Sequence, residues 1–440
     1  MLGDPNNLKT ASLFDRLINH SLISTLVNLR GNPRGCVLTE PLWGIPFNLY
    51  APYVSIYMLA MGLTDPEIGL LASIGTGFQV IMALLSGVIT DKLGRRLTTL
   101  LFDIVAWSVP ALISALAQNF WYFLAAAIIN SVWRITHNSW TCLLVEDADP
   151  KNLADIFSWI NIALLLAGLI APLTGPLIQA YSLVPTVRGL YFFAAFMFTL
   201  KAVVTYVLTE ETAQGKIRMH ETQRQSPLAV LSEYRHVFLD LLRTPKTLYT
   251  AGIMLIVSIT TLISSNFWAV LVSEKLNIPS ADLWLFAFLR SVVMILFFFV
   301  VMPRISVMPF KIPMTVGFLG FIISQIVLIA VPMQNYIWLL ISVFLEAFSL
   351  ATVGPLVDRL TTLTIDPKER ARIMSILAVG IILLTSPFGW VAGLLSNLNK
   401  DLPFILNIGL FAVGALLAYL AGRFSANASA AELVPVETAD

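Results

Sequence analysis

The chain contains few charged and few reactive side chains. Only 12% of its 440 residues are charged and 57% are hydrophobic, whereas about 25% of the residues in soluble domains are charged. This excludes a soluble globular protein, because a water-soluble fold of this length cannot bury so much apolar surface. The two cysteines, Cys36 and Cys142, form no metal-binding or redox pattern. The four histidines are scattered along the chain, and their positions suggest no metal or catalytic site.

Several functional signatures are also absent from the sequence. There is no nucleotide-binding loop of the type G-x-x-x-x-G-K-(S/T), so nothing supports direct use of ATP. No nucleophile and base are spaced as an enzyme needs them, and the N-terminus has no charged-then-apolar signal peptide with a cleavage site. We therefore expect no enzyme activity, no cofactor, no metal ion and no nucleic-acid partner.

Long apolar runs are abundant instead. A transmembrane helix needs about 20 mostly apolar residues, and twelve segments qualify. They predict an all-α membrane protein with 12 transmembrane helices. The twelve predicted spans are 37–61, 68–90, 97–117, 119–145, 153–180, 186–209, 247–273, 281–302, 312–332, 335–357, 369–396 and 402–424.

The polar segments divide these spans into two sets of six. Residues 1–36 form an N-terminal segment, and an amphipathic helix is predicted over 8–30, either on the membrane surface or against the bundle. Residues 210–246 are the longest polar interval and predict a solvated linker with one short helix near 227–242. The predicted domains are the N-terminal segment 1–36, a first bundle over 37–209, the linker 210–246, a second bundle over 247–424 and a cytoplasmic tail over 425–440.

The basic residues predict the orientation. Of the 27 lysines and arginines, 21 lie in one set of loops, three lie in the opposite set (Arg188, Lys275 and Lys400), and three lie within spans. Loops rich in basic residues stay in the cytoplasm. Both termini and the linker are therefore predicted to be cytoplasmic, in a multi-pass protein of the plasma (inner) membrane.

A sequence repeat relates the two sets of spans. Asp149-Pro150-Lys151 precedes the fifth span, and Asp366-Pro367-Lys368 precedes the eleventh, 217 residues later. Aspartate at the N-cap followed by proline at the first helical position is typical of a helix start. The repeat predicts two pseudo-symmetric six-helix bundles in tandem.

The loop between the second and third spans contains a specific motif. It matches every defined position of the pattern G-x-x-x-D-(R/K)-x-G-(R/K)-(R/K), and the matching residues are Gly87, Asp91, Lys92, Gly94, Arg95 and Arg96. In this motif and in its length, the chain resembles the major facilitator superfamily of secondary transporters, nearest to its 12-helix proton-coupled exporters. An ordinary orientation loop would need neither the glycine nor the aspartate. We expect Gly87 to allow a neighbouring helix to approach closely.

The resemblance also implies a cytoplasmic gate at this loop. Asp91 is expected at the positive N-terminus of the eleventh helix, near residue 366. Arg95 is expected to pair with Glu146 or Asp147 at the end of the fourth span. These contacts would form in one state of the transporter and break in the other.

Polar residues inside spans are costly and commonly face a cavity or a partner. In this fold the first, fourth, seventh and tenth helices line the central path, so we expect their polar faces to meet there. An arginine in the fourth span also partly resembles the family pattern R-x-x-Q-G. The candidate residues on these four faces are Glu40, Gly44, Asn48 and Pro52; Asn130, Arg134, His137, Asn138 and Thr141; Ser258, Thr261, Ser265 and Trp268; and Ser342, Glu346 and Ser349.

The most specific hypothesis concerns one carboxylate at mid-depth. Glu346 is predicted to titrate and to couple transport to protons, and Arg134 is predicted to be its charge partner or the contact for an anionic substrate. Arg290, Glu40 and His137 are further candidates for the path, and Lys201 is predicted to extend its amine toward the cytoplasm. Static ion pairs or snorkelling side chains would explain the same residues without a transport role.

Small residues recur at every fourth position in two spans. The fifth span has Ala163, Ala167, Ala171 and Gly175, and the eleventh has Thr385, Gly389, Gly393 and Asn397. Close helix packing is the simpler role for them. The fifth-span residues also resemble, in degraded form, the G-x-x-x-G-P-x-x-G-G motif of the exporters in the family, which favours efflux.

These inferences together predict a monomeric secondary transporter in a lipid bilayer. It would move a small organic solute by alternating access, in exchange for protons. Proton-coupled uptake of a polar or anionic nutrient is the alternative, which Arg134, Asn138 and Asn48 would suit. A membrane sensor or lipid-handling protein on the same scaffold, without solute turnover, is an alternative of another class.

Overall fold

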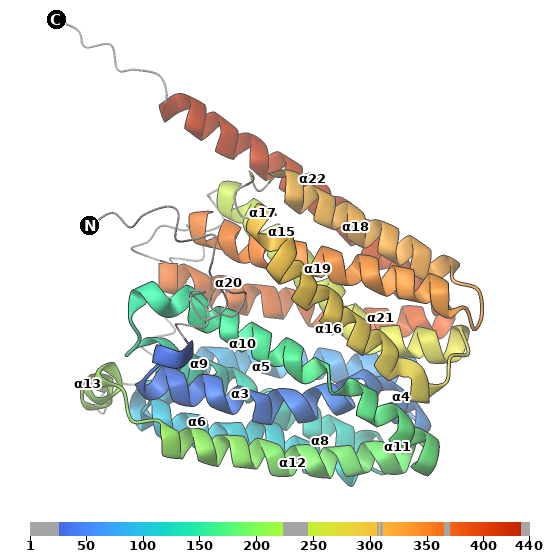
Figure 1. Cartoon of the computed structure of the whole chain (residues 1–440), viewed down its shortest axis with the longest axis horizontal. Helices are drawn as coiled ribbons and strands as arrows, with labels where there is room; N and C mark the ends of the chain where they lie inside the picture. Colours follow the sequence, from blue (N-terminus) through green and yellow to red (C-terminus); the bar gives the residue numbers. More distant parts are fainter. Residues whose placement is uncertain (1–25, 223–244, 306–307, 309–310, 365–369, 433–440) are drawn as a thin grey trace, which may run out of the picture.

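The fold is helical throughout the part of the chain that the structure describes. The structure is a computed structural model and describes residues 26–222, 245–305, 308, 311–364 and 370–432. Helices up to residue 208 pack together as one half, and those from residue 245 onward form the other half (Figure 1). The predicted amphipathic helix over 8–30 and the linker helix near 227–242 lie wholly or mostly outside the described residues.

The first half contains six membrane-crossing segments. Helix α5 and helix α12 each cross as one continuous helix, and the other four segments are broken into two helices each. In chain order the helices are α3 (Gly31–Tyr50) with α4 (Val54–Ala60), α5 (Asp65–Leu93), α6 (Arg95–Asp103) with α7 (Val109–Ala115), α8 (Phe120–Asn130) with α9 (Trp133–Val145), α10 (Leu153–Gly168) with α11 (Thr174–Tyr181), and α12 (Leu183–Leu208).

The second half repeats this organisation after a short helix, α13 (Ala213–Thr222), in the linker. Its six segments are α15 (Pro245–Val270), α16 (Leu283–Val300) followed by the single turn α17 (Met302–Ile305), α18 (Lys311–Ala330), α19 (Tyr336–Thr364), α20 (Arg370–Thr385) with α21 (Pro387–Leu398), and α22 (Leu402–Glu432). Helix α13 was not predicted, since the expected linker helix lay further along the chain.

The predicted fold class, 12 transmembrane helices in two six-helix bundles, is confirmed. Ten helical runs of the described chain are long and apolar enough to cross a membrane by themselves. The predicted spans 37–61 and 119–145 are the other two, and each contains a break. Pro52 lies in a tight turn between α3 and α4, because proline cannot donate the next helical hydrogen bond. Before α9, the Ser131 hydroxyl donates to the Ile128 carbonyl at 2.6 Å and competes with the helix.

Helix α5 begins at Asp65 and ends just after Asp91, so we call the two ends of the bundle the Asp65 end and the Asp91 end. The two ends differ in the segments that pack around them. At the Asp65 end, one hydrophobic core continues from the first half into the second, where Tyr57 and Phe198 belong to the same cluster as Phe267. Hydrogen bonds also join the halves there. The Ser73 hydroxyl accepts from the Trp390 amide at 2.7 Å, and the Ser386 hydroxyl donates to the Ser73 carbonyl at 2.8 Å.

Glycines allow the helices to touch at this end. A Cβ atom on Gly389 would lie 2.8 Å from the Gly69 carbonyl oxygen, and one on Gly393 would lie 2.6 Å from the Asp65 carbonyl oxygen. This confirms the packing role predicted for the small residues of the eleventh span. The close approach predicted at Gly87 is not found among the described residues, because no atom of a neighbouring described helix lies within 4 Å of a Cβ built there. On α5 the close approach occurs at Gly69 instead.

One copy of the predicted repeat is described. The Asp149 carboxylate accepts from the Lys151 amide at 3.0 Å and so caps the short turn that leads into α10. The second copy, residues 366–368, falls outside the described residues.

Candidate functional site

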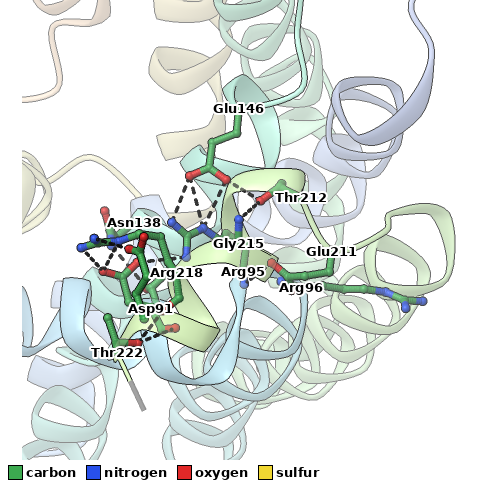
Figure 2. Close-up of polar contacts among 12 residues, drawn as sticks. Asp91, Arg95, Arg96, Asn138, Glu146, Glu211, Thr212, Gly215, Arg218 and Thr222 are labelled. Atoms are coloured by element: carbon green, nitrogen blue, oxygen red, sulfur yellow. Dashed lines mark hydrogen bonds and ion pairs between the residues drawn. The ribbon is translucent and has the colours of Figure 1, made fainter. Parts of the chain in front are cut away.

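A buried arginine lies at the centre of the predicted gate. The Arg95 side chain is 5% exposed at the start of α6. It donates to Asp91 Oδ1 at 2.9 Å, and its Nη2 lies 3.1 Å from Glu146 Oε1 at the end of α9 (Figure 2). The predicted pairing of Arg95 with Glu146 is therefore confirmed. Asp147, the alternative partner, accepts instead from the Asn32 amide at 2.9 Å.

The linker helix α13 supplies the other partners of this site. Arg218 Nη2 lies 3.1 Å from Asp91 Oδ2, and the Thr222 hydroxyl donates to the Asp91 carbonyl at 3.2 Å. The Thr212 hydroxyl donates to Glu146. The negative charge of Asp91 is the main cause that raises the pKa of Arg218 above its ordinary value. Asp91 was expected at the start of the eleventh helix, and the residues just before Arg370 are outside the described chain.

The backbone conformation at Gly94, in the motif loop, requires glycine. Gly94 has φ +84°, which favours glycine, and a Cβ there would lie 2.6 Å from Glu211 Oε2. Glu211 accepts from the amides of Arg95 and Arg96 at 2.9 and 3.0 Å. A carboxylate thereby caps the positive end of α6. The Arg96 side chain turns away and stacks on the Tyr206 ring at 3.9 Å, and Lys92 is exposed.

We refer to these residues as the Asp91 cluster. Within the described chain, the partners of its side chains belong to the first half and to residues 211–222 of the linker, which include α13, as Figure 2 shows. The cluster consists of Asp91, Arg95, Glu146, Glu211, Thr212 and Arg218.

A second cluster of charges joins the two halves at the opposite end. Lys400 Nζ lies 2.6 Å from Asp65 Oδ2 of the first half and 2.5 Å from Glu274 Oε2 of the second. The Ser396 hydroxyl also donates to Asp65. Partial burial lowers the pKa of Lys400, but the hydrogen bonds to Asp65 and Glu274 outweigh it, so the pKa lies above its ordinary value. Lys400 therefore stays charged at neutral pH. These four residues are the Asp65 cluster.

The carboxylate predicted to titrate is buried but has a different partner. Glu346 on α19 is 8% exposed, and its Oε2 lies 2.7 Å from Arg290 Nη2 on α16. The prediction that Arg134 is its charge partner is wrong for this conformation. Arg134 donates to Gln79 of α5 at 2.9 Å and stacks on Trp133 at 4.0 Å. The contacts of both side chains lie within their own halves, because neighbouring helices of the same half are closer than the facing helix.

The polar face of the first span also has partners within its own half. Asn48 Nδ2 donates to the Gly44 carbonyl at 2.8 Å and lies 3.4 Å from the Leu164 carbonyl of α10. A Cβ on Gly44 would lie 3.0 Å from Ala167 of α10. Gly44 and Asn48 therefore contact α10 of the same half in this conformation, and their place on a path between the halves stays a prediction. Glu40 lines a cavity inside the first half.

Two further candidates of the fourth span are Asn138, which lies close to the Asp91 cluster, and His137, which lies close to Arg134. Asn138 Nδ2 lies 3.3 Å from the Thr90 hydroxyl of α5, one residue from Asp91. The His137 ring meets the Trp133 ring edge-on with centroids 5.5 Å apart. Asn138 therefore links the fourth span to the motif loop.

Lys201 differs from its predicted role, and Trp268 has a described ring partner. Lys201 does not extend to the membrane surface; it is 5% exposed, and its Nζ lies 2.6 Å from Asp103 Oδ2. Trp268 packs edge-on against Phe286 with centroids 5.6 Å apart, within the core of the Asp65 end. Burial against α6 explains the position of Lys201, because the nearby Asp103 carboxylate is a better partner than the distant membrane surface. The place of Trp268 on the path stays a prediction.

The sequence interpretation missed several partners that the fold brings in. Gln79 could have been identified from the sequence as a partner for a buried polar group, since it is an amide in the middle of an apolar span. Glu211 directly follows the sixth span, but nothing in its spacing indicates that it caps α6. Among the described residues, no group of three or more His, Cys, Asp or Glu side chains is placed to hold a metal ion.

The comparisons with known proteins agree with this architecture. The model of the Major Facilitator Superfamily matches residues 43–307, more than half of the chain. The chain belongs to the Major Facilitator Superfamily. It is therefore a membrane-embedded transporter for a small molecule, and the lipid bilayer is its surroundings.

Two curated relatives have the same name. The transporter is 28% identical over 216 residues to "Multidrug resistance protein MdtG" of Serratia proteamaculans (strain 568), an alignment of 45% of this chain and 49% of the relative. It is 35% identical over 96 residues to the protein of that name in Erwinia billingiae (strain Eb661), covering 21% and 22% of the two chains. The alignments thus span about half, or less, of the length of these relatives.

Solved structures share the fold. A mutant of the nucleoside transporter NupG superimposes with a TM-score of 0.70 at 14% identity, over 89% of this chain and 100% of that one. The human organic anion transporter MFSD10 (TETRAN) gives a TM-score of 0.59 at 18% identity, over 88% and 99%. At these identities the likeness concerns the fold alone.

Proposed function

We propose that this transporter exports a small organic solute in exchange for protons, by alternating access between two rigid halves. The observation that supports alternating access is the unequal packing of the two ends. Bonds and a shared core join the halves at the Asp65 end, whereas the partners described for the Asp91 cluster lie in the first half and in residues 211–222 of the linker. The halves that move are residues 37–209 and 247–424, and residues 210–246 connect them.

The basic loops support an orientation for this conformation. The Asp91 end contains most of the lysines and arginines, so it faces the cytoplasm with both termini. The conformation is then closed toward the outside. In the opposite state the Asp91 cluster would meet the start of α20, whose N-terminal dipole attracts the Asp91 carboxylate. The protein acts as a monomer in the plasma membrane, because one chain contains both halves.

Proton exchange is supported by Glu346, and efflux by the two relatives named for multidrug resistance. Glu346 is a buried carboxylate whose described ion-pair partner is Arg290. Movement of Arg290 away from Glu346 would raise the affinity of the carboxylate for a proton, and its return would release the proton. The Arg290 side chain is 38% exposed, so a solute that enters from the aqueous side can contact it.

Glu346→Gln is expected to lower gradient-driven transport by at least about ten-fold, because an amide forms the weaker, uncharged hydrogen bond and binds no proton. The measurement is solute uptake into proteoliposomes that are acidic inside, after a thermal-shift screen has identified a solute. Exchange of solute for solute, which needs no proton, should persist. Glu346→Asp is the control and should retain part of the gradient-driven rate. Near-normal gradient-driven transport in both Glu346→Gln and Arg134→Ala would exclude these residues from the mechanism.

A covalent link across the Asp65 end tests alternating access directly. The pair Asp65→Cys and Ser396→Cys, with Cys36 and Cys142 replaced by alanine, joins two positions that are hydrogen-bonded in this conformation. Oxidation should stop transport, and a reducing agent should restore it. The matched controls are the two single cysteine variants. The oxidant should not change the transport rate of either one. Full transport by the cross-linked protein would contradict the proposed movement.

A further inference from the structure

The first half has an apolar groove on its outer face, between α3 and α10. Its volume is about 310 Å³, which is within the range of small-molecule sites. The walls are formed by aliphatic side chains and by Trp159, and none of the described lining residues is charged. Figure 1 shows the two helices side by side, with α12 on the other side of α3. The proposed transport cycle does not use this groove.

The groove opens toward the lipid and away from the other half. Leu38 of α3 and Leu166 of α10 line it and are 54% and 47% exposed. Residues two positions apart lie on nearly opposite faces of a helix. A Cβ atom on Gly168 of α10 would clash with Ser291 of the second half, and Glu40 of α3 lines the interior cavity together with several tryptophans. Leu166 and Leu38 therefore face outward, where the bilayer surrounds the transporter.

The groove has the length of one membrane leaflet. Its α10 wall runs from Trp159 to Ile170, which is about 16 Å along a helix, and half of the hydrocarbon core of a bilayer is about 15 Å. Both α3 and α10 begin at the Asp91 end, so this leaflet is the cytoplasmic one in the orientation proposed above. Trp159 lies near the mouth, and indole rings are common at the level of the lipid headgroups. One acyl chain of a phospholipid therefore fits the groove lengthwise.

Two arginines lie at the cytoplasmic mouth of the groove. Arg34 precedes Leu38 by one turn on the same face of α3, and Arg30 is the residue just before the helix. Both are exposed, and neither has an ion-pair partner among the described residues. Asp155, one turn before the groove on α10, already has an interaction of its own. Helical side chains lean toward the N-terminus of their helix, so the Arg34 guanidinium is directed toward the headgroups.

We propose that the groove holds one acyl chain of an anionic phospholipid, whose phosphate is bonded by Arg34 and Arg30. A guanidinium bonds two phosphate oxygens at once, and basic pockets between membrane helices on the cytoplasmic side bind anionic headgroups. A zwitterionic phospholipid supplies the same chain, but its own positive group offsets the phosphate. A water-soluble anion lacks the chain that the groove accepts. Both walls belong to the first half, so the lipid stays bound whichever end of the transporter is open.

The test is native mass spectrometry of the purified full-length protein, titrated with two lipids that have identical acyl chains. They are anionic phosphatidylglycerol and zwitterionic phosphatidylcholine. Phosphatidylglycerol should bind saturably and at least about five-fold more tightly, as expected for one basic residue at an anionic headgroup. Equal affinity for the two lipids, or no saturable binding of phosphatidylglycerol, would overturn the proposal.

Variants place the lipid in this groove. Arg34→Gln should weaken the binding of phosphatidylglycerol by about five-fold and leave that of phosphatidylcholine unchanged, whereas Lys216→Gln, at an exposed lysine of α13, should change neither. Ala163→Phe fills the groove and should weaken the binding of both lipids by at least about ten-fold, the loss expected for about two CH₂ groups left unburied. Ala412→Phe, at an exposed position of α22, is its control and should have no such effect. Size-exclusion profiles show whether each variant is folded. Unchanged affinity for phosphatidylglycerol in folded Arg34→Gln or folded Ala163→Phe would contradict the assignment.

Photo-crosslinking identifies the occupant of the groove in a membrane. A benzophenone side chain at position 38, in full-length protein reconstituted into vesicles of both lipids, should attach to phosphatidylglycerol in preference to phosphatidylcholine and add the mass of one lipid. Attachment to a peptide from residues 1–25, which precede the groove residue Leu26, or to a second copy of the chain would overturn the proposal. Because these measurements involve no transport, failure of the transport experiments would leave the result standing, and the reverse also holds.

Discussion

Asp91→Asn is expected to lower the initial rate of transport by at least about ten-fold while the protein still inserts into the membrane. Asp91 bonds to Arg95 at 2.9 Å and to Arg218 at 3.1 Å. Removing its charge weakens two charge-assisted hydrogen bonds, each of which contributes about 1.5–3 kcal/mol when a charged group is involved. Arg95 is buried, so it would keep only Glu146 as a charged partner. The measurements are solute flux in proteoliposomes and the amount of protein in the membrane fraction.

Two comparisons make this prediction specific. Glu221→Gln removes an exposed carboxylate, 3.1 Å from Arg218 on the same helix, and should leave transport near normal. If Asp91 and Arg218 act through their mutual contact, Arg218→Ala combined with Asp91→Asn should be no worse than Asp91→Asn alone. Unchanged transport in Asp91→Asn would mean that the motif loop serves only to orient the chain in the membrane.

Lys201→Met is expected to destabilise the folded protein by about 3–5 kcal/mol, which is the usual effect of leaving one buried charge without its partner. Asp103 is 4% exposed on its side chain and lies in the interior of the first half, so water cannot replace the lost ammonium. The measurement is the free energy of unfolding in detergent, followed by tryptophan fluorescence.

The rescue variant separates charge from packing. Lys201→Met with Asp103→Asn has no unpaired charge, so much of the lost stability should return. Lys216→Met, which changes an exposed lysine of α13 in the same way, should change stability little. A Lys201→Met protein as stable as the original would mean that the ion pair contributes nothing to folding.

Local features of the sequence determined the crossings, the repeat and the motif. Apolar runs of about 20 residues predict membrane helices, because any unpaired backbone group in lipid is costly. Gly94 and the adjacent charges of the motif marked the loop, and the structure gives Gly94 φ +84°. The resemblance to the family implied that Arg95 pairs with Glu146 or Asp147, and the structure shows the pair with Glu146.

Partners that depend on helix rotation and neighbour order could not be predicted in this way. Glu346 was assigned to Arg134 because both lie on polar faces expected to line the central path, and its described partner is Arg290 on helix α16. Lys201 was assigned to the membrane surface from its depth alone, and Asp103 holds it inside. A buried charge pairs with the opposite charge nearest in space, and sequence spacing does not give that distance.

The sequence by itself determined that this chain is a twelve-span membrane protein of two related halves with a charged loop at one face. Hydropathy and sequence motifs are properties of short stretches of the chain, so they can be recognised without a structure. Only the tertiary structure decided which end of the halves is closed, that α13 contacts Asp91, and that Glu40 lies in a cavity lined by tryptophans. These features arise where helices far apart in the sequence pack together, and side-chain burial and charge pairing are fixed only by that packing.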